Sequence, residues 1–119
     1  MIDVETNCFG TIDKENSVIM SPNYPKEYPH DLNCSWLLSV PLGERVLLHL
    51  ENFTTYDDND FMMIYDGADS ESNVIASLSG NFSQDISSTG SKILLRFITT
   101  KKNEIFGGFR IRYEGKYTI

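Results

Sequence analysis

Short segments in which apolar and polar residues alternate, separated by turns, constrain the fold more than any other feature of the sequence. The period of two is that of half-buried β-strands, and a turn recurs about every eight to twelve residues. No stretch keeps a helical period over eleven residues. We therefore predict an all-β fold, an antiparallel β-sandwich with little or no helix. The expected strands are 18–20, 34–40, 45–53, 60–65, 73–78, 91–99 and one opened by Gly107-Gly108.

A segment rich in proline and tyrosine precedes the strand at residues 34–40. Its three prolines fix φ and exclude helix, whereas Tyr24 and Tyr28 give an irregular segment apolar area to bury. We therefore expect a packed corner rather than a flexible linker. Gly10 is expected to form a turn before the first strand, and residues 87–90 another turn.

Length and charge limit the classes of protein to which the chain can belong. The 119 residues suit one domain, and a net charge of -7 argues against a nucleic-acid partner. No apolar run is long enough for a membrane span, so direct membrane insertion is not expected. We assign residues 1–7 to a leader, 8–115 to the domain and 116–119 to a tail, and interpret Met1 as an added start residue.

The sequence offers no catalytic constellation. His30 and His49 lack the neighbours of a triad or a metal site, and glycine-rich phosphate loops are absent. Seventeen acidic residues could supply a pair of carboxylates, yet no spacing selects one. We do not expect an enzyme, although the chain could be a non-catalytic module of a multidomain enzyme.

An acidic cluster at residues 56–60, followed by Asp66 and Asp69, is the one segment with metal-binding chemistry. Calcium takes six to eight oxygen ligands, which such a loop could provide. The cluster lacks the spacing, the central glycine and the terminal glutamate of an EF-hand loop. The alternative is a solvated acidic loop that aids solubility.

Two cysteines and three sequons bear on the compartment. Cys8 and Cys34 are either reduced, buried thiols or a disulfide, and a disulfide would add about 3.5 kcal/mol of stability by loop entropy. Asn33, Asn52 and Asn81 begin three N-glycosylation sequons, whereas the composition predicts about 1.5 sequons by chance. Sequons alone do not establish secretion.

An ordered set of motifs spans the chain from Cys8 to about Tyr113. These motifs are Cys8, Ser21-Pro22-Asn23-Tyr24-Pro25, Tyr28-Pro29, Asn33-Cys34-Ser35-Trp36, Phe53, Asp60-Phe61-Met62-Met63-Ile64-Tyr65-Asp66-Gly67, Leu95-Arg96-Phe97, Gly107-Gly108-Phe109 and Tyr113. Taken together, they are similar to the motifs of the CUB domain family. The resemblance implies an extracellular, jelly-roll-like sandwich of two five-stranded sheets and a disulfide between Cys8 and Cys34. Ile86 to Thr89 further resembles modules that alternate with sushi domains.

The chain departs from calcium-binding members of the family. Their three carboxylates correspond here to Tyr56, Asp60 and Thr100, so only the middle one is present. Losing two carboxylates removes most of the charge that offsets calcium dehydration, and we expect no metal or cofactor. The alternative is a calcium site rebuilt from Asp60 with Asp57 or Asp58, which would capture a basic residue of a partner. A second disulfide, common in the family, is also missing.

The resemblance and the missing catalytic residues predict a non-catalytic, extracellular protein-recognition module of a larger secreted or membrane-anchored protein. The expected partners are neighbouring domains and a protein ligand, and charge complementarity favours a basic ligand. The alternatives are carbohydrate stacking on Tyr24, Tyr28 or Tyr56, and a structural spacer. The candidate partner-binding residues are Tyr56, Asp57, Asp58, Asp60, Thr100 and Lys101.

Overall fold

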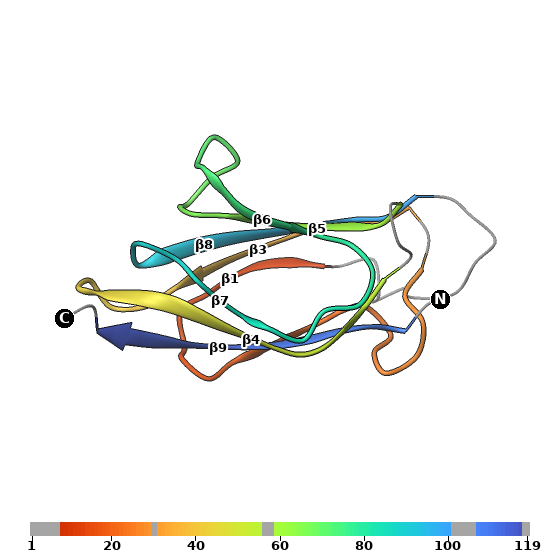
Figure 1. Cartoon of the computed structure of the whole chain (residues 1–119), viewed down its shortest axis with the longest axis horizontal. Helices are drawn as coiled ribbons and strands as arrows, with labels where there is room; N and C mark the ends of the chain where they lie inside the picture. The colour runs from red at the N-terminus through yellow and green to blue at the C-terminus, as the bar shows by residue number, and fades with distance from the viewer. Residues whose placement is uncertain (1–7, 30, 56–58, 101–106, 118–119) are drawn as a thin grey trace.

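Two β-sheets packed face to face make up the described part of the chain (Figure 1). The computed structural model describes residues 8–29, 31–55, 59–100 and 107–117. No helix occurs within these ranges, so the all-β prediction is confirmed. The strands are β1 (Phe9–Ile12), β2 (Val18–Met20), β3 (Asn33–Ser39), β4 (Glu44–Thr54), β5 (Phe61–Tyr65), β6 (Val74–Leu78), β7 (Asp85–Ser87), β8 (Lys92–Ile98) and β9 (Gly108–Tyr117).

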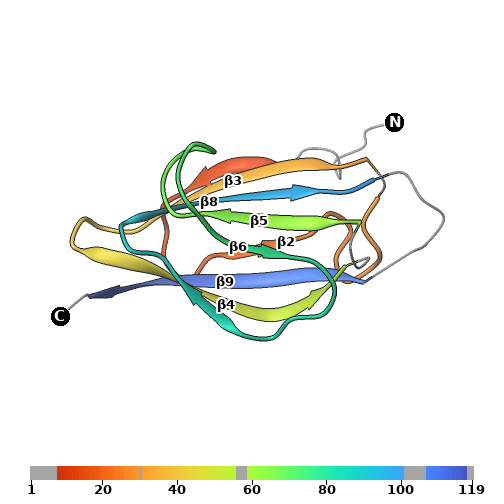
Figure 2. The same cartoon turned by 45° about the horizontal axis from the view of Figure 1, so that its top comes forward.

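One sheet has the strand order β1-β3-β8-β5-β6 and the other β2-β9-β4-β7, and Figure 2 shows both layers. The sandwich is confirmed, but the expectation of two five-stranded sheets needs correction, because the described residues give the second sheet four strands. The strands of the described residues pair antiparallel, as expected, except that β1 runs parallel to β3. The chain crosses to the other sheet as β2 before returning, and such a crossover permits parallel pairing.

The predicted alternation places apolar side chains between the sheets. In β3, Cys34 and Leu38 are fully buried and Trp36 nearly so, while the residues between them are only partly buried. Strand β4 follows the same pattern, with Val46 and Leu48 completely inaccessible. The two strands belong to different sheets, so their inner faces close the core from opposite sides.

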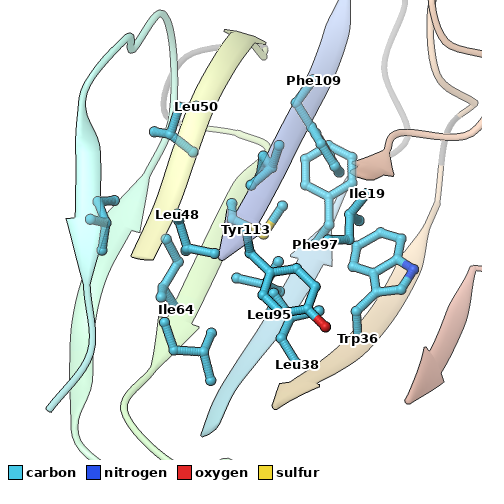
Figure 3. Packing of buried hydrophobic residues seen from close by; sticks show 14 of the residues in the cluster. Ile19, Trp36, Leu38, Leu48, Leu50, Ile64, Leu95, Phe97, Phe109 and Tyr113 are labelled. Atoms are coloured by element: carbon cyan, nitrogen blue, oxygen red, sulfur yellow. The ribbon is translucent and has the colours of Figure 1, made fainter. Parts of the chain in front are cut away.

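Aromatic rings fill the core on both sides of the gap between the sheets (Figure 3). Phe109 of β9 meets Phe97 of β8 edge to face, with ring centroids 4.8 Å apart, and Trp36 of β3 at 5.9 Å. Phe53 of β4 stacks on the Phe109 ring, with ring centroids 5.8 Å apart. Edge-to-face pairs of this kind add stability beyond the area they bury.

The two strands that the sequence did not predict are short and depend on their neighbours. Strand β1 replaces the expected turn at Gly10 and pairs with β3 from Phe9↔Ser35 onward. Strand β7 begins before the expected turn at 87–90 and buries Ile86 alone. Neither carries enough alternating residues to be recognised without its pairing partner.

The disulfide joins Cys8, just before β1, to Cys34 in β3. Both cysteines are buried, and the Ser35 backbone N–H donates to the Cys8 carbonyl oxygen at 3.0 Å. This pairing is the one that the resemblance implies, and it is confirmed. Among the described residues, no helix has the length and apolar character needed to cross a membrane.

The proline corner is packed, as predicted. Tyr28 is half-buried and meets Phe97 edge to face at 5.1 Å. Ser21 is buried, and its Oγ accepts a hydrogen bond from the Phe109 N–H at 3.0 Å. Gly108 opens β9 at φ +118°, and a Cβ there would lie 2.2 Å from Ser21 Oγ. Only glycine fits this contact between the corner and β9.

Candidate functional site

Three loops meet around the carboxylate of Asp60 at one end of the sandwich, on the right in Figure 1. Asp60 has no exposed surface. Its Oδ2 accepts a hydrogen bond from the Tyr28 hydroxyl at 2.5 Å, and its Oδ1 accepts one from the Thr100 N–H at 3.1 Å. A buried carboxylate is tolerated only with such donors. Asp60 therefore ties its own β4–β5 loop to the proline corner and to the segment after β8.

Two buried threonines extend these connections. Thr99 Oγ1 accepts from the Leu32 N–H at 2.7 Å, and the Thr99 N–H donates to the Leu32 carbonyl at 3.1 Å. Thr55 Oγ1 accepts from the Gly80 N–H at 3.0 Å and donates to the Asp60 carbonyl at 3.3 Å. A fourth loop, between β6 and β7, is thereby joined to the other three. We call this end, defined by these residues with Tyr28 and Thr100, the loop end.

The structure brings together two of the predicted partner-binding residues. Asp60 and Thr100 are hydrogen-bonded, but the Asp60 side chain is buried and therefore holds the loops instead of facing a partner. Thr100 is exposed beside it. The other candidates, Tyr56, Asp57, Asp58 and Lys101, lie outside the described residues.

The remaining acids of the predicted cluster stabilise turns elsewhere. Asp66 accepts hydrogen bonds from the N–H and hydroxyl groups of Thr89, at 3.0 and 2.8 Å. Asp69 accepts one from the Glu71 N–H at 3.0 Å. Within the described ranges, no three histidine, cysteine or acidic residues gather as metal ligands. Asp57 and Asp58 lie outside those ranges, so both the loss of calcium and the rebuilt site stay predictions.

The tyrosines considered for sugar stacking have structural contacts. Tyr28 packs on Phe97 and donates to Asp60. The Tyr24 hydroxyl accepts a hydrogen bond from Asn52 Nδ2 at 2.8 Å. Tyr56 falls outside the described residues. Both described tyrosines therefore serve the packed corner, and no observation favours a sugar platform there.

The outer face of the four-stranded sheet carries a charged network that sequence reasoning did not identify. His49 bridges Asp85, at 3.2 Å, and Glu114, at 2.5 Å. Beside it, Glu51 pairs with Arg110 and Arg112 of β9. The alternation of charged with apolar residues in β9 was the sequence signal that could have indicated this network. His30 lies outside the described residues.

Two titrating groups of β9 have shifted pKa values. The hydrogen bond from His49 holds the pKa of Glu114 below its ordinary value, against an opposing effect of burial. Burial raises the pKa of Tyr113 to about 12, with help from the nearby charges of Asp13 and Glu15. The Tyr113 hydroxyl donates to the Ile12 carbonyl at 3.0 Å. Tyr113 therefore stays protonated and joins β9 to the first strand of the other sheet.

Fold and site together define a disulfide-linked β-sandwich domain with interconnected end loops. A family model described as CUB domain matches residues 8–113. The chain belongs to the CUB domain family, as the motif resemblance implies.

The curated relatives are much longer than this chain. It is 34% identical over 114 residues to cubilin of Canis lupus familiaris, a match that covers 92% of this chain and 3% of that protein. It is 32% identical over 100 residues to a bone morphogenetic protein 1 homolog of Strongylocentrotus purpuratus, a match that covers 80% of this chain and 16% of that protein. The chain therefore corresponds to one non-catalytic module within larger multidomain proteins.

Solved structures show the same fold. The MASP-1 CUB2 domain, in a crystal structure bound to Ca²⁺, superposes with a TM-score of 0.76 at 28% identity, covering 90% of this chain and 99% of that one. The full extracellular region of zebrafish Gpr126/Adgrg6 superposes with a TM-score of 0.82 at 21% identity, covering 93% of this chain and 15% of that one. The second likeness concerns the fold alone.

Proposed function

We propose that this CUB domain is a recognition module of a larger extracellular protein and that its loop end binds a protein partner without calcium. The observation that carries the proposal is the set of buried and partly buried hydrogen bonds that joins four loops around Asp60. Loops fixed before binding lose less conformational entropy when a partner docks. Binding residues are also commonly found on loops that a rigid scaffold positions.

The extracellular setting has two kinds of support. The disulfide between Cys8 and Cys34 is of the type that persists in oxidising compartments. The similar solved structures include an extracellular region, and the curated relatives are many times longer than the chain. Neighbouring domains of the parent protein are therefore expected beside this one.

A basic partner is favoured by charge. The net charge is -7, and Asp57 and Asp58 lie in the loop that Asp60 anchors. Thr100, which is exposed, and Lys101 continue this candidate surface along the chain. Charges of opposite sign accelerate association, with the strongest effect at low salt.

Independence of calcium is supported by what surrounds Asp60. Both of its carboxylate oxygens already accept hydrogen bonds from the chain, and Tyr56 and Thr100 stand where calcium-binding members carry carboxylates. The alternative is a rebuilt calcium site, which Asp57 or Asp58 would complete. The similar MASP-1 CUB2 domain, which was solved with Ca²⁺ bound, is the reason to test for it. Calcium-dependent capture of a basic residue is the outcome that would replace this part of the proposal.

The test is association with an array of purified extracellular proteins in the presence of a calcium chelator. For each protein that binds, the association rate is measured with the D57K/D58K variant. D13K/E71K is the matched control, because it changes the net charge equally at Asp13 and Glu71, which are exposed and lie elsewhere in the chain. We expect the first variant to associate about tenfold more slowly at low salt and the control to behave like wild type. Equal rates for both variants would contradict the proposed surface.

A further inference from the structure

A groove of about 530 Å³ lies on the outer face of the five-stranded sheet. The groove is shallow and open to solvent. Strands β1, β3 and β8 form its floor, and the β5–β6 loop stands out from the same side of the sheet (Figure 1). The groove is lined by Phe9, Asn33, Ser35, Ala68, Asp69, Ser70, Leu94 and Arg96.

Two residues of a glycosylation sequon line this groove. In Asn33-Cys34-Ser35, strand alternation turns the cysteine inward to its disulfide and the asparagine and serine outward into the groove. Asn33 is exposed. Its Oδ1 accepts a hydrogen bond from Arg96 at 3.3 Å. In the part of the chain that the structure describes, its Nδ2, the atom that would take a sugar, has no hydrogen-bond partner.

The walls of the groove suit the first sugar of an N-linked glycan. Phe9 is 69% exposed although it sits in a strand, and it pairs with Ser35, diagonally adjacent to Asn33. Strand spacing places such diagonal positions about 8 Å apart, within reach of a sugar attached to Asn33. A pyranose ring presents C–H groups to an aromatic face and hydroxyl groups around its edge, where Arg96, Asp69 and Ser70 offer polar partners.

We propose that Asn33 carries an N-linked glycan whose first N-acetylglucosamine lies in this groove against Phe9. A bond forms between Nδ2 and the anomeric carbon of the sugar, the bond from that carbon to a lipid pyrophosphate donor breaks, and Nδ2 loses one proton. The pyrophosphate leaves on the lipid. The proposal rests on the extracellular location given above, because the donor and its transferase belong to the secretory pathway.

The other two sequons lack these surroundings. Asn52 lies beside an irregularity in β4, and its Nδ2 donates to the Tyr24 hydroxyl. Asn81 forms an isolated β-bridge with Thr54. Neither lines the groove, so a glycan on either one would have no seat against Phe9.

The first test is site occupancy in protein secreted from eukaryotic cells behind an added signal peptide. The glycans are trimmed to one N-acetylglucosamine, and peptide mass spectrometry reads each sequon. We expect the sugar on Asn33 in wild type, higher occupancy in S35T and none in S35A. A bare Asn33 in secreted wild type would overturn the proposal. The array test above does not depend on Asn33, so partner binding by the bare protein would leave the proposed function standing.

The second test is the seating of the sugar. In an N52Q/N81Q background, the acetyl methyl proton signal of the remaining N-acetylglucosamine should shift upfield in the folded protein, because the ring of Phe9 shields it. The F9L variant keeps an apolar side chain without the ring, and the shift should disappear. The same signal position in wild type and in F9L would overturn the seating against Phe9.

Discussion

Replacing Tyr28 by phenylalanine tests the loop end at one atom. The variant Y28F removes the hydroxyl that donates to Asp60 Oδ2 at 2.5 Å. It keeps the ring that packs edge to face on Phe97. Because Asp60 is fully buried, water cannot replace the lost donor without opening the corner. The loss in free energy of unfolding should therefore report the contribution of the hydrogen bond between Tyr28 and Asp60.

The magnitude follows from the type of bond. Hydrogen bonds to charged groups contribute about 1.5 to 3 kcal/mol, so Y28F should lower the free energy of unfolding by about 2 kcal/mol. For a domain of this size, that loss corresponds to a fall in Tm on the order of 8 °C. Urea denaturation should show a lower midpoint with an unchanged slope, since the folded core is retained.

Y24F is the matched control, because it also removes one hydroxyl from the proline corner. The Tyr24 hydroxyl accepts from Asn52, a neutral and exposed partner. We expect a change within about 0.5 kcal/mol, as for ordinary surface substitutions. If Y28F costs no more than Y24F, the carboxylate of Asp60 does not depend on Tyr28 and the reasoning is refuted.

Three further predictions concern the rest of the molecule. Replacing both cysteines by alanine should lower the free energy of unfolding by about 3.5 kcal/mol, measured by urea denaturation. G108A should lower Tm by several degrees, because its Cβ meets Ser21 at positive φ, whereas G107A, with open space around it, should not; similar Tm values would contradict the close contact. Glu114 has a lowered pKa, so the stabilisation that it gains from His49 is present above pH 4.5 and lost as the pH falls below that value. The stability difference between wild type and H49L should therefore shrink below pH 4.5, and a difference independent of pH would exclude this pair as its source.

Much of the fold was predictable because it depends on local patterns. The alternation in β3 and β4 identifies the inward residues correctly, and the prolines and tyrosines before β3 predict a packed corner. The parallel strand β1 could not be predicted in this way. Its four residues, Phe9–Ile12, include a glycine and are held by pairing with β3 and by the disulfide that precedes them.

The loop end was only partly predictable, because its contacts join residues far apart in the chain. The sequence singles out Asp60, but the hydroxyl of Tyr28 is 32 residues away and the Thr100 N–H is 40 residues away. Pairing of β5 with β8 brings Asp60 and Thr100 together. Likewise, the groove near Asn33 exists only because β1 places Phe9 beside β3. Such juxtapositions follow from sheet topology, which alternation alone does not specify.

Thermal unfolding in millimolar calcium and again in chelator tests most directly whether the loop end works without the ion. We expect the same Tm in both solutions, because hydrogen bonds to Asp60 hold the loops. An ion present at about a hundred times its dissociation constant would add about 2.7 kcal/mol, which raises Tm on the order of 10 °C. A rise of that size would contradict the account and make calcium-dependent capture of a basic residue the mechanism to pursue.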